Sequence, residues 1–356
     1  MNGDMKNKKA LKQNVITYGM VIAFWAVIQI MMKTGNLSSL AKGLLVPICM
    51  YVILAVSLNL TVGILGELSL GHAGFMCVGA FSGAFFTKVA ESAIPSVGVR
   101  FFIALLIGAA VAGLCGFLIG IPVLRLKGDY LAIVTLAFGE IIKNLVNVIY
   151  LGRDSAGFHF SMKDIMALNM EPDGEVIIKG AQGITGAPTD SNFTLGIILL
   201  LITLFIVLNL IHSRDGRAIM AIRDNTIAAE SVGIHITKYK LMAFSISAAL
   251  AGVAGVLYAH NLSTLTALPK NFGYNMSIMI LVFVVLGGIG NIRGSIIASV
   301  ILTLLPELLR GLNDYRMLIY SIVLIVMMLF NWAPKCIEWR EKVAARFKKS
   351  VKKEAE

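Results

Sequence analysis

Charged and polar side chains within apolar segments are the residues of this sequence that could act on a solute. Glu140 and Lys143 stand one helical turn apart in the apolar run 130–150, which also carries Thr135. A charge at the centre of a bilayer costs about 2.5 to 3.5 kcal/mol, and such charges normally pair and face the interior of a helix bundle. Glu140 and Lys143 therefore form either a structural ion pair or part of a solute path.

A second group of polar residues lies in the stretch 58–83, among closely spaced glycines. Glycines let helices approach closely, and a break in a helix would free backbone carbonyls and amides for a polar solute. Helix packing is the competing interpretation, because Gly79 and Gly83 form a G-x-x-x-G face. A lone histidine is also more often a packing residue than a proton carrier. The candidate path residues of this stretch are Asn59, Thr61, Glu67, Ser69 and His72.

The polar segment 212–240 holds five bases and three acids, yet its alanines and isoleucines keep helical spacing. This pattern predicts one or two short amphipathic helices, the second of which ends at Gly233 as a C-cap. We expect this segment to be a docking surface for a cytoplasmic partner rather than a solvated linker. Its candidate residues are Gly216, Arg217, Arg223, Asp224, Ala228, Ala229, Glu230 and Gly233.

Transmembrane helices are the elements that must carry these residues. Of the 356 residues, 57% are hydrophobic and 14% are charged, whereas soluble proteins are about 25% charged. A span needs about 20 apolar residues, so the composition predicts an all-α polytopic membrane protein with about ten spans, some of them short or broken. The apolar runs lie near 15–32, 43–63, 68–87, 101–124, 130–150, 193–211, 241–259, 276–290, 295–309 and 317–333.

The distribution of Lys and Arg predicts the orientation of these spans. With ten crossings and a cytoplasmic N-terminus, the inner segments hold 20 of these residues and the outer segments hold 10. This bias supports cytoplasmic N- and C-termini. The runs 276–290 and 295–309 would keep this orientation if they formed a re-entrant pair, and a count of ten allows an inverted repeat. The expected parts are a cytoplasmic tail 1–14, a transmembrane domain 15–333 with an outer loop 151–192 and an inner loop 212–240, and a basic cytoplasmic tail 334–356.

Several kinds of chemistry find no support in the sequence. It contains no G-x-x-x-x-G-K-[ST] phosphate loop, so we expect this chain not to hydrolyse ATP. The four cysteines include no C-x-x-C pair, so we expect no metal site and no disulfide framework. The Lys and Arg residues cluster at the chain ends and in one loop, which indicates membrane topology rather than binding of nucleic acid.

Five blocks of sequence together resemble the permease subunits of bacterial branched-chain amino acid ABC importers, specifically the M-type member of the paired permeases. They follow one another in the family's order over most of residues 45–310. The blocks are LNLTVGILGELSLGHAGFMCVGAF, GDYLAIVTLAFGEIIKNL, QGITG, GRAIMAIRDNTIAAESVGIHITKYKLMAFSISAALAGVAGVLYA and LGGIGNIRGSIIAS.

The resemblance implies a multi-pass permease of the bacterial cell membrane that binds no cofactor itself. It further implies a second homologous permease subunit, two cytoplasmic ATPase subunits that hold ATP-Mg, and an extracytoplasmic binding protein that delivers leucine, isoleucine or valine. A helix of the inner loop would dock on an ATPase subunit through Ala228, Ala229, Glu230 and Gly233, although Glu230 follows the alanines instead of preceding them. QGITG, at 182–186, could help to receive the binding protein.

Three alternatives stay open. Permeases for urea or short amides look similar over the same blocks, so an importer of these solutes is a close rival. A proton-coupled secondary carrier would use Glu140 and His72 as a relay, but the ordered loop 212–240 argues against it. A purely structural membrane subunit is disfavoured by the polar residues within the apolar runs.

Overall fold

Helices form at each of the ten apolar runs, because a segment in a bilayer must satisfy its backbone hydrogen bonds internally. The computed structural model describes residues 2–35, 38–91, 93–126, 128–155, 157–172, 174–309 and 315–332, so the tail 334–356 lies outside the described residues. The helices at these runs are α1 (Asn2–Lys33), α2 (Ser39–Asn59), α3 (His72–Val89), α4 (Val97–Val123), α5 (Asp129–Val148), α6 (Phe193–His212), α9 (Ile236–Ala259), α11 (Tyr274–Gly287), α12 (Ile292–Leu308) and α13 (Arg316–Trp332).

Within the described residues, seven segments are long and apolar enough to cross a membrane. They comprise the apolar part of α1, α2 with the π-helix that follows it, α4, α5, α6, α9, and α11 with the short α10 (Pro269–Phe272) before it. The helices α12 and α13 have 17 residues each, which is about 26 Å at 1.5 Å per residue, against a hydrocarbon core of about 30 Å. Ten full crossings, the inverted repeat and the side on which the termini lie stay predictions.

The helix α2 lies at the centre of the bundle. Of the residues in its apolar 18-residue stretch, 94% are buried, against only 11% in the corresponding stretch of α1. The helix α9 packs against α2, and α3 and α4 pack on α9 and on each other through small residues: a Cβ atom at Gly79 of α3 would lie 2.3 Å from the Cα atom of Gly252 of α9. Gly79 therefore serves helix packing, as the competing interpretation of the glycine-rich stretch held.

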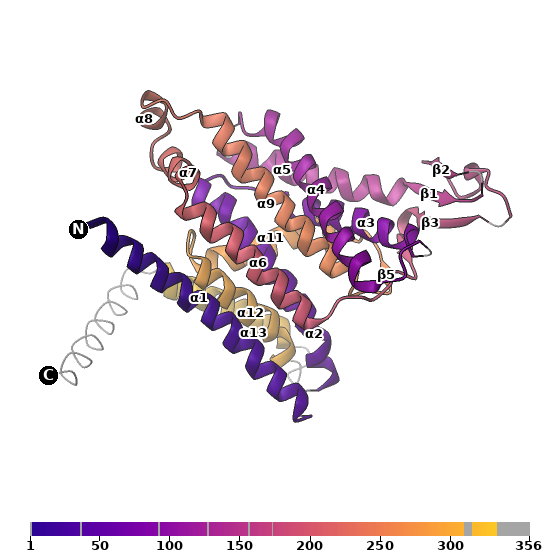
Figure 1. Cartoon of the computed structure of the whole chain (residues 1–356), viewed down its shortest axis with the longest axis horizontal. Helices are drawn as coiled ribbons and strands as arrows, with labels where there is room; N and C mark the ends of the chain where they lie inside the picture. The colour runs from indigo at the N-terminus through magenta and orange to yellow at the C-terminus, as the bar shows by residue number, and fades with distance from the viewer. Residues whose placement is uncertain are drawn as a thin grey trace.

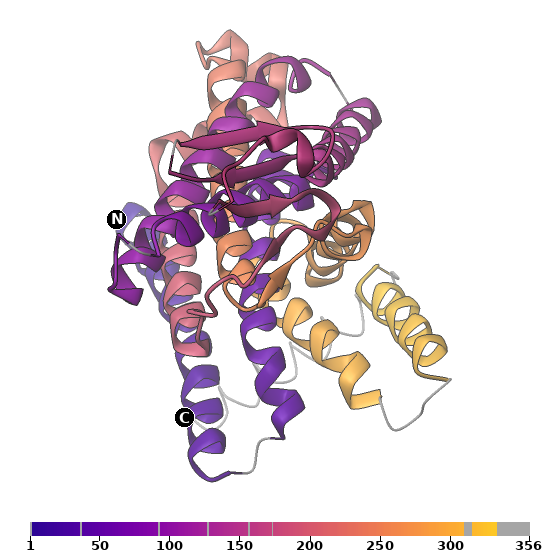
Figure 2. The same cartoon turned by 90° about the vertical axis from the view of Figure 1, so that its right-hand side faces the viewer.

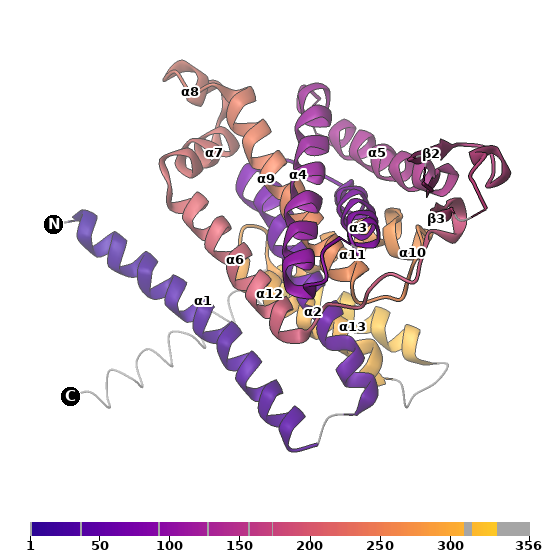
Figure 3. The ribbon, with the colours of Figure 1, turned by 45° about the vertical axis from the view of Figure 1, so that its right-hand side comes forward.

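The sheet and the polar segment 212–240 lie at opposite ends of the bundle. The helix α6 leads from the last strand of the outer loop to α7 (Arg214–Asp224) and α8 (Thr226–Ser231), and α9 leads back to the sheet. Figures 1 and 3 show α7 and α8 at one end of these helices and the strands at the other. The loops 151–192 and 212–240 thus lie at opposite ends of the bundle, and the side of the membrane on which each lies stays a prediction.

The expectation of an all-α protein is wrong at the end that carries the outer loop. Five short strands form one antiparallel sheet in the order β2-β1-β3-β4-β5, seen in front of the bundle in Figure 2. The strands lie outside the apolar helices, so nothing confines this part of the backbone to helix. They are β1 (Tyr150–Arg153), β2 (Phe158–Ser161), β3 (Glu175–Lys179), β4 (Ile184–Thr185) and β5 (Thr264–Leu265), with 3-10 turns at Met166–Leu168 and Gly180–Gln182.

Candidate functional site

A break in the chain separates α2 from α3, as the glycine-rich stretch predicted. After Asn59 the helix widens into a buried π-helix, Leu60–Leu65, and it ends at Gly66, whose φ of +82° is left-handed. The amide of Glu67 donates to the carbonyl oxygen of Thr61 at 3.1 Å and closes this end. The chain then runs without regular structure until α3 begins at His72. Single π-helical turns occur often at functional sites.

The side chain of Asn59 holds the turn before α12. Its Nδ2 atom donates to Ser295 Oγ at 2.9 Å, and its Oδ1 atom accepts from the amide of Gly290 at 2.9 Å. A Cβ atom at Gly63 would lie 2.4 Å from that same amide nitrogen. Asn59 thus joins the end of α2 to the turn 288–291.

His72 is a packing residue at the start of α3. Its Nε2 atom lies 2.7 Å from Ser57 Oγ, and that hydroxyl donates to the carbonyl oxygen of Leu54 at 3.0 Å. The imidazole therefore donates from Nε2, because the single hydroxyl proton of Ser57 is already used. Neighbouring Ser247, on α9, donates to the carbonyl oxygen of Ser57 at 2.6 Å. These contacts tie α2, α3 and α9 together.

Thr135 connects α5 to the break. Its hydroxyl accepts from the amide of Leu70 at 3.0 Å and donates to the carbonyl oxygen of Ala132 at 3.0 Å. Ser69, beside Leu70, is 2% exposed. In the part of the chain that the structure describes, its hydroxyl has no hydrogen-bond partner.

Glu140 and Lys143 form an ion pair on α5, and the carboxylate has a second partner. Its Oε1 atom accepts from the amide of Tyr274 at 2.7 Å, which is the first residue of α11. A negative charge at a helix N-terminus is favourable, because it meets unpaired amides and the positive end of the helix dipole. The side chain of Lys143 is 8% exposed and that of Glu140 is 25% exposed. Part of the Glu140 side chain therefore reaches the surface of this chain inside a candidate membrane span, beside exposed Asn144.

The polar segment 212–240 forms two helices, as its spacing predicted. The hydroxyl of Ser213 accepts from the amide of Gly216 at the start of α7, and Asn225 Oδ1 accepts from the amide of Ala228 at the start of α8, both at 3.0 Å. Gly233 follows α8 with a φ of +84°, which confirms the predicted C-cap. The exposed candidates are Arg217, Arg223, Asp224, Ala228, Glu230 and Gly233, whereas Gly216 and Ala229 are buried.

This segment contacts the break directly, which the sequence did not indicate. The guanidinium of Arg223 donates from Nη1 to the carbonyl oxygen of Gly63 at 2.9 Å. Lys240, near the start of α9, forms an ion pair with Glu67. Glu67 is thus joined to the polar segment and lies apart from the Glu140 pair. The only signal for Lys240 was its place as the last base of that segment.

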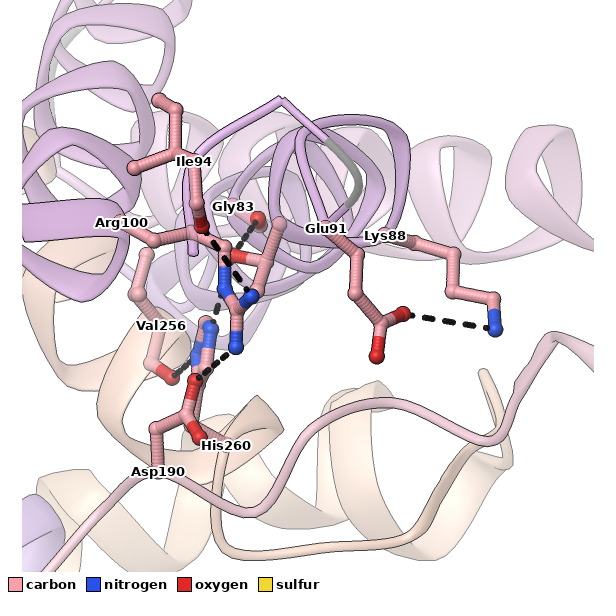
Figure 4. Close-up of polar contacts among 9 residues, drawn as sticks. Gly83, Lys88, Glu91, Ile94, Arg100, Asp190, Val256 and His260 are labelled. Carbon is pink, nitrogen blue, oxygen red and sulfur yellow. Dashed lines mark hydrogen bonds and ion pairs between the residues drawn. The ribbon is translucent and has the colours of Figure 1, made fainter. Parts of the chain in front are cut away.

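A polar junction joins the helix ends near the sheet (Figure 4). The Nη2 atom of Arg100, on α4, lies 3.3 Å from Asp190 Oδ2, and its Nη1 atom donates to the carbonyl oxygen of Ile94 at 3.4 Å. His260, which follows α9, contacts Thr87 Oγ1 on α3 through Nε2 at 2.9 Å. Burial lowers the pKa of His260 from its ordinary value of 6.5, and the charge of Arg100 adds to this effect, while the backbone of Val256 and the charge of Asp190 oppose it. Sequence analysis did not single out this junction.

A cleft of about 450 Å³ lies nearby, on the side of the sheet, with both positive and negative charges in its walls. The ammonium of Lys88 pairs with two carboxylates of the lining. Its Nζ atom lies 3.7 Å from Glu91 Oε2 (Figure 4) and 3.2 Å from Glu175 Oε1. The remaining polar residues of its lining are Arg153, Asp154 and Ser155.

The known proteins most similar in sequence to this chain among those given below are transport permeases. The family described as "Branched-chain amino acid transport system / permease component" matches residues 40–330. The chain is 35% identical over 294 residues to the high-affinity branched-chain amino acid transport system permease protein LivM of Salmonella typhimurium. The aligned stretch covers 80% of this chain and 67% of that relative. LivM of Escherichia coli gives the same identity and coverage. A probable branched-chain amino acid transport permease protein LivM of Methanocaldococcus jannaschii is 27% identical over 278 residues, covering 69% of this chain and 74% of that protein.

No solved structure matches the chain. The family match runs from the second residue of α2 through α12, and it includes the break after α2, the Glu140 pair and the two helices of the polar segment. The chain therefore belongs to the family of branched-chain amino acid transport system permease components.

Proposed function

We propose that this chain is the M-type permease subunit of an ATP-driven importer for leucine, isoleucine and valine in a bacterial cell membrane. The observation that carries this proposal is the match of residues 40–330 to the permease family, with 35% identity to LivM. The expected complex contains a second permease, two ATPase subunits that bind ATP-Mg, and an extracytoplasmic binding protein. This chain itself supplies the membrane helices and their contacts to those partners.

The exposed face of α8 supports docking to an ATPase subunit. Ile227 is 81% exposed and Val232 is 75% exposed, although both are large apolar residues at the polar end of the bundle. Ala229 is buried on the opposite side and fixes the helix to its neighbours. Exposed apolar patches on ordered elements often mark protein–protein contacts. In the proposed complex, Ile227, Ala228 and Glu230 face the ATPase subunit.

The surface around Glu140 supports a solute path between this chain and the second permease. A carboxylate that faced lipid at this place would be costly, yet the Glu140 side chain is 25% exposed. Tyr274 and Asn144 lie exposed beside it. We therefore assign this face of α5 and α11 to the wall of the path, where Glu140 could accept the ammonium group of an amino acid. Thr135 and Ser69 lie buried behind this face, between α5 and the break.

The sheet end supports contact with the binding protein. It lies opposite α8 along α6 and α9, and it carries the cleft with charges of both signs. The import cycle then follows from linkage between the two ends: solute moves when the loaded binding protein and ATP favour different permease conformations. The helices α6 and α9 run between the two docking surfaces.

The contacts of His72 and Glu140 disfavour the proton-coupled carrier. His72 is bonded to Ser57, and Glu140 is bonded to Lys143 and Tyr274. The two candidate relay residues therefore have separate partners. The urea permease alternative is also not favoured, because the relatives with the highest identity reported above are branched-chain amino acid permeases.

Uptake by the purified complex tests the proposal. This chain would be assembled with its second permease and ATPase subunits in liposomes. In one arm the liposomes contain ATP and the binding protein is outside them. In the matched arm the liposomes contain the binding protein and no ATP. We expect labelled leucine, isoleucine and valine to enter only when ATP faces the ATPase subunits and the binding protein faces the sheet. Uptake driven by a proton gradient without ATP, or ATP-driven uptake of urea in place of leucine, would contradict it.

A further inference from the structure

Arg223 points toward the membrane domain although it belongs to the polar segment. Its Nη1 atom donates to the carbonyl oxygen of Gly63 at 2.9 Å, while Nε and Nη2 donate to Asp224 Oδ1 at 3.1 and 3.0 Å. The last four carbonyl groups of a helix have no amide partner within the helix. Gly63 lies within that last turn, so Arg223 satisfies a carbonyl that the end of the π-helix leaves open.

An apolar cluster fixes α7 to the same π-helix. Ile219 of α7 is buried together with Leu60, Ile64 and Leu65 of the π-helix and Ala243 of α9, in a cluster separate from the main core. A Cβ atom at Gly66 would also lie 2.6 Å from Arg223 Cγ. Because α7 packs closely on the π-helix through this cluster and through the Arg223 side chain, displacement of α7 must displace the π-helix or break these contacts.

The opposite side of Gly63 contacts the turn 288–291. A Cβ atom at Gly63 would lie 2.0 Å from Asn59 Oδ1 and 2.4 Å from the amide nitrogen of Gly290, so no other residue fits here without a shift. The amide of Gly290 is the group that Asn59 holds at 2.9 Å. Movement of Gly63 would therefore act on this hydrogen bond and on the start of α12, which Asn59 also binds through Ser295.

We propose that Arg223 is a positioning residue that transmits movement of α8 and α7 to the π-helix, and through Gly63 to the turn 288–291. This inference rests on the proposed function, since it needs ATPase subunits that move α8. The π-helix is the element that changes between two arrangements, because a π-turn holds one residue more than an α-turn and can relax at its end. Arg223 thus acts on the membrane domain rather than on the ATPase surface.

Transport per hydrolysed ATP distinguishes these roles in the complete complex. In Arg223→Gln we expect normal retention of the ATPase subunits and normal ATP hydrolysis, but about tenfold less leucine imported per ATP, which is within the range for losing a hydrogen bond from a charged group. Arg223→Lys keeps the charge and a donor and should recover part of the ratio. Arg214→Gln, an exposed arginine on the same helix, is the matched control and should leave the ratio unchanged.

Two results would overturn the inference. One is a normal ratio of leucine to ATP in Arg223→Gln. The other is loss of the ATPase subunits from that variant with an unchanged ratio in the complexes that remain, because Arg223 would then be a docking residue.

A labelling experiment tests the moving element even if Arg223→Gln fails to assemble or the imported solute differs. A cysteine at half-buried Leu68, in a cysteine-free background, should react with a maleimide at a rate that changes when ATP is trapped in the complex. An equal rate with and without trapped ATP would refute movement of the break. ATP-dependent labelling in a complex that imports no leucine would instead contradict only the proposed substrate.

Discussion

Removing Glu140 should destabilise the protein more than removing its partner Lys143, because the two side chains differ in burial. In Glu140→Ala, the ammonium of Lys143 stays in a site where only 8% of its side chain is exposed. Breaking a buried pair in this way costs about 3 to 5 kcal/mol. The amide of Tyr274 also loses its acceptor at the start of α11, and loss of a helix cap costs about 0.5 to 2 kcal/mol.

Lys143→Ala leaves a less costly arrangement. The Glu140 side chain is 25% exposed and still accepts from Tyr274, so the loss should be about 1 to 3 kcal/mol. The double variant Glu140→Leu/Lys143→Leu contains no buried charge and loses mainly the cap, about 0.5 to 2 kcal/mol. We therefore expect the order Glu140→Ala, Lys143→Ala, double variant, from least to most stable.

The assay is the midpoint of thermal unfolding of the purified complex, together with the amount recovered from membranes. Ile141→Ala is the matched control, because Ile141 lies between the two charged residues and is 63% exposed. A double variant less stable than Glu140→Ala would refute the mutual compensation of the charges. A Lys143→Ala variant less stable than Glu140→Ala would refute the assignment of the larger penalty to the unpaired ammonium.

Three further predictions concern the two ends of the bundle. A cysteine at Met166, which is 89% exposed near the sheet, should react with an impermeant maleimide in intact cells, and one at Ile227 should react only after permeabilisation; labelling of both in intact cells would contradict the topology. Gly233→Val places a β-branched residue at a φ of +84°, which costs about 1 to 2 kcal/mol, so ATPase retention should fall while the membrane domain keeps its Tm; unchanged retention would show that this cap does not shape the docking surface. Since burial lowers the pKa of His260 below 6.5, the unfolded chain takes up the proton first as pH falls through 6.5, and the folded state loses stability there. The Tm should accordingly drop from pH 7.5 to 5.5, less so in His260→Gln, and an equal drop in both proteins would rule out this histidine as the cause.

Gly63 is the residue at which two contacts of the proposed mechanism meet. The carbonyl oxygen of Gly63 accepts a hydrogen bond from Arg223. The side of Gly63 on which a Cβ atom would stand lies against Asn59 and Gly290. The two contacts lie on one residue of a π-helix, so the polar segment 212–240 and the turn before α12 meet at a single element. Variants at Arg223 and at Gly63 should therefore not be additive, since residues in one contact network are energetically coupled.

Local patterns in the sequence determined the helices and several of their details. Ten apolar runs predicted the positions of ten helices, because a membrane span needs a long uninterrupted apolar segment. The spacing of Glu140 and Lys143 placed them on one face of α5, where they pair. Gly233 predicted the end of α8, and this glycine has the expected left-handed φ. These features depend on residues within one or two helical turns.

Tertiary structure alone decided which of these segments meet. In the sheet, Ile184 pairs with Leu265, and α6 and α9 lie between these two residues in the sequence. No local pattern could therefore specify this edge of the sheet. The contact of Arg223 with Gly63 joins residues 160 positions apart, and that of Asn59 with Ser295 joins residues 236 apart. Such contacts depend on how closely the helix backbones approach and on the direction of each side chain, and the packing of the whole bundle sets both.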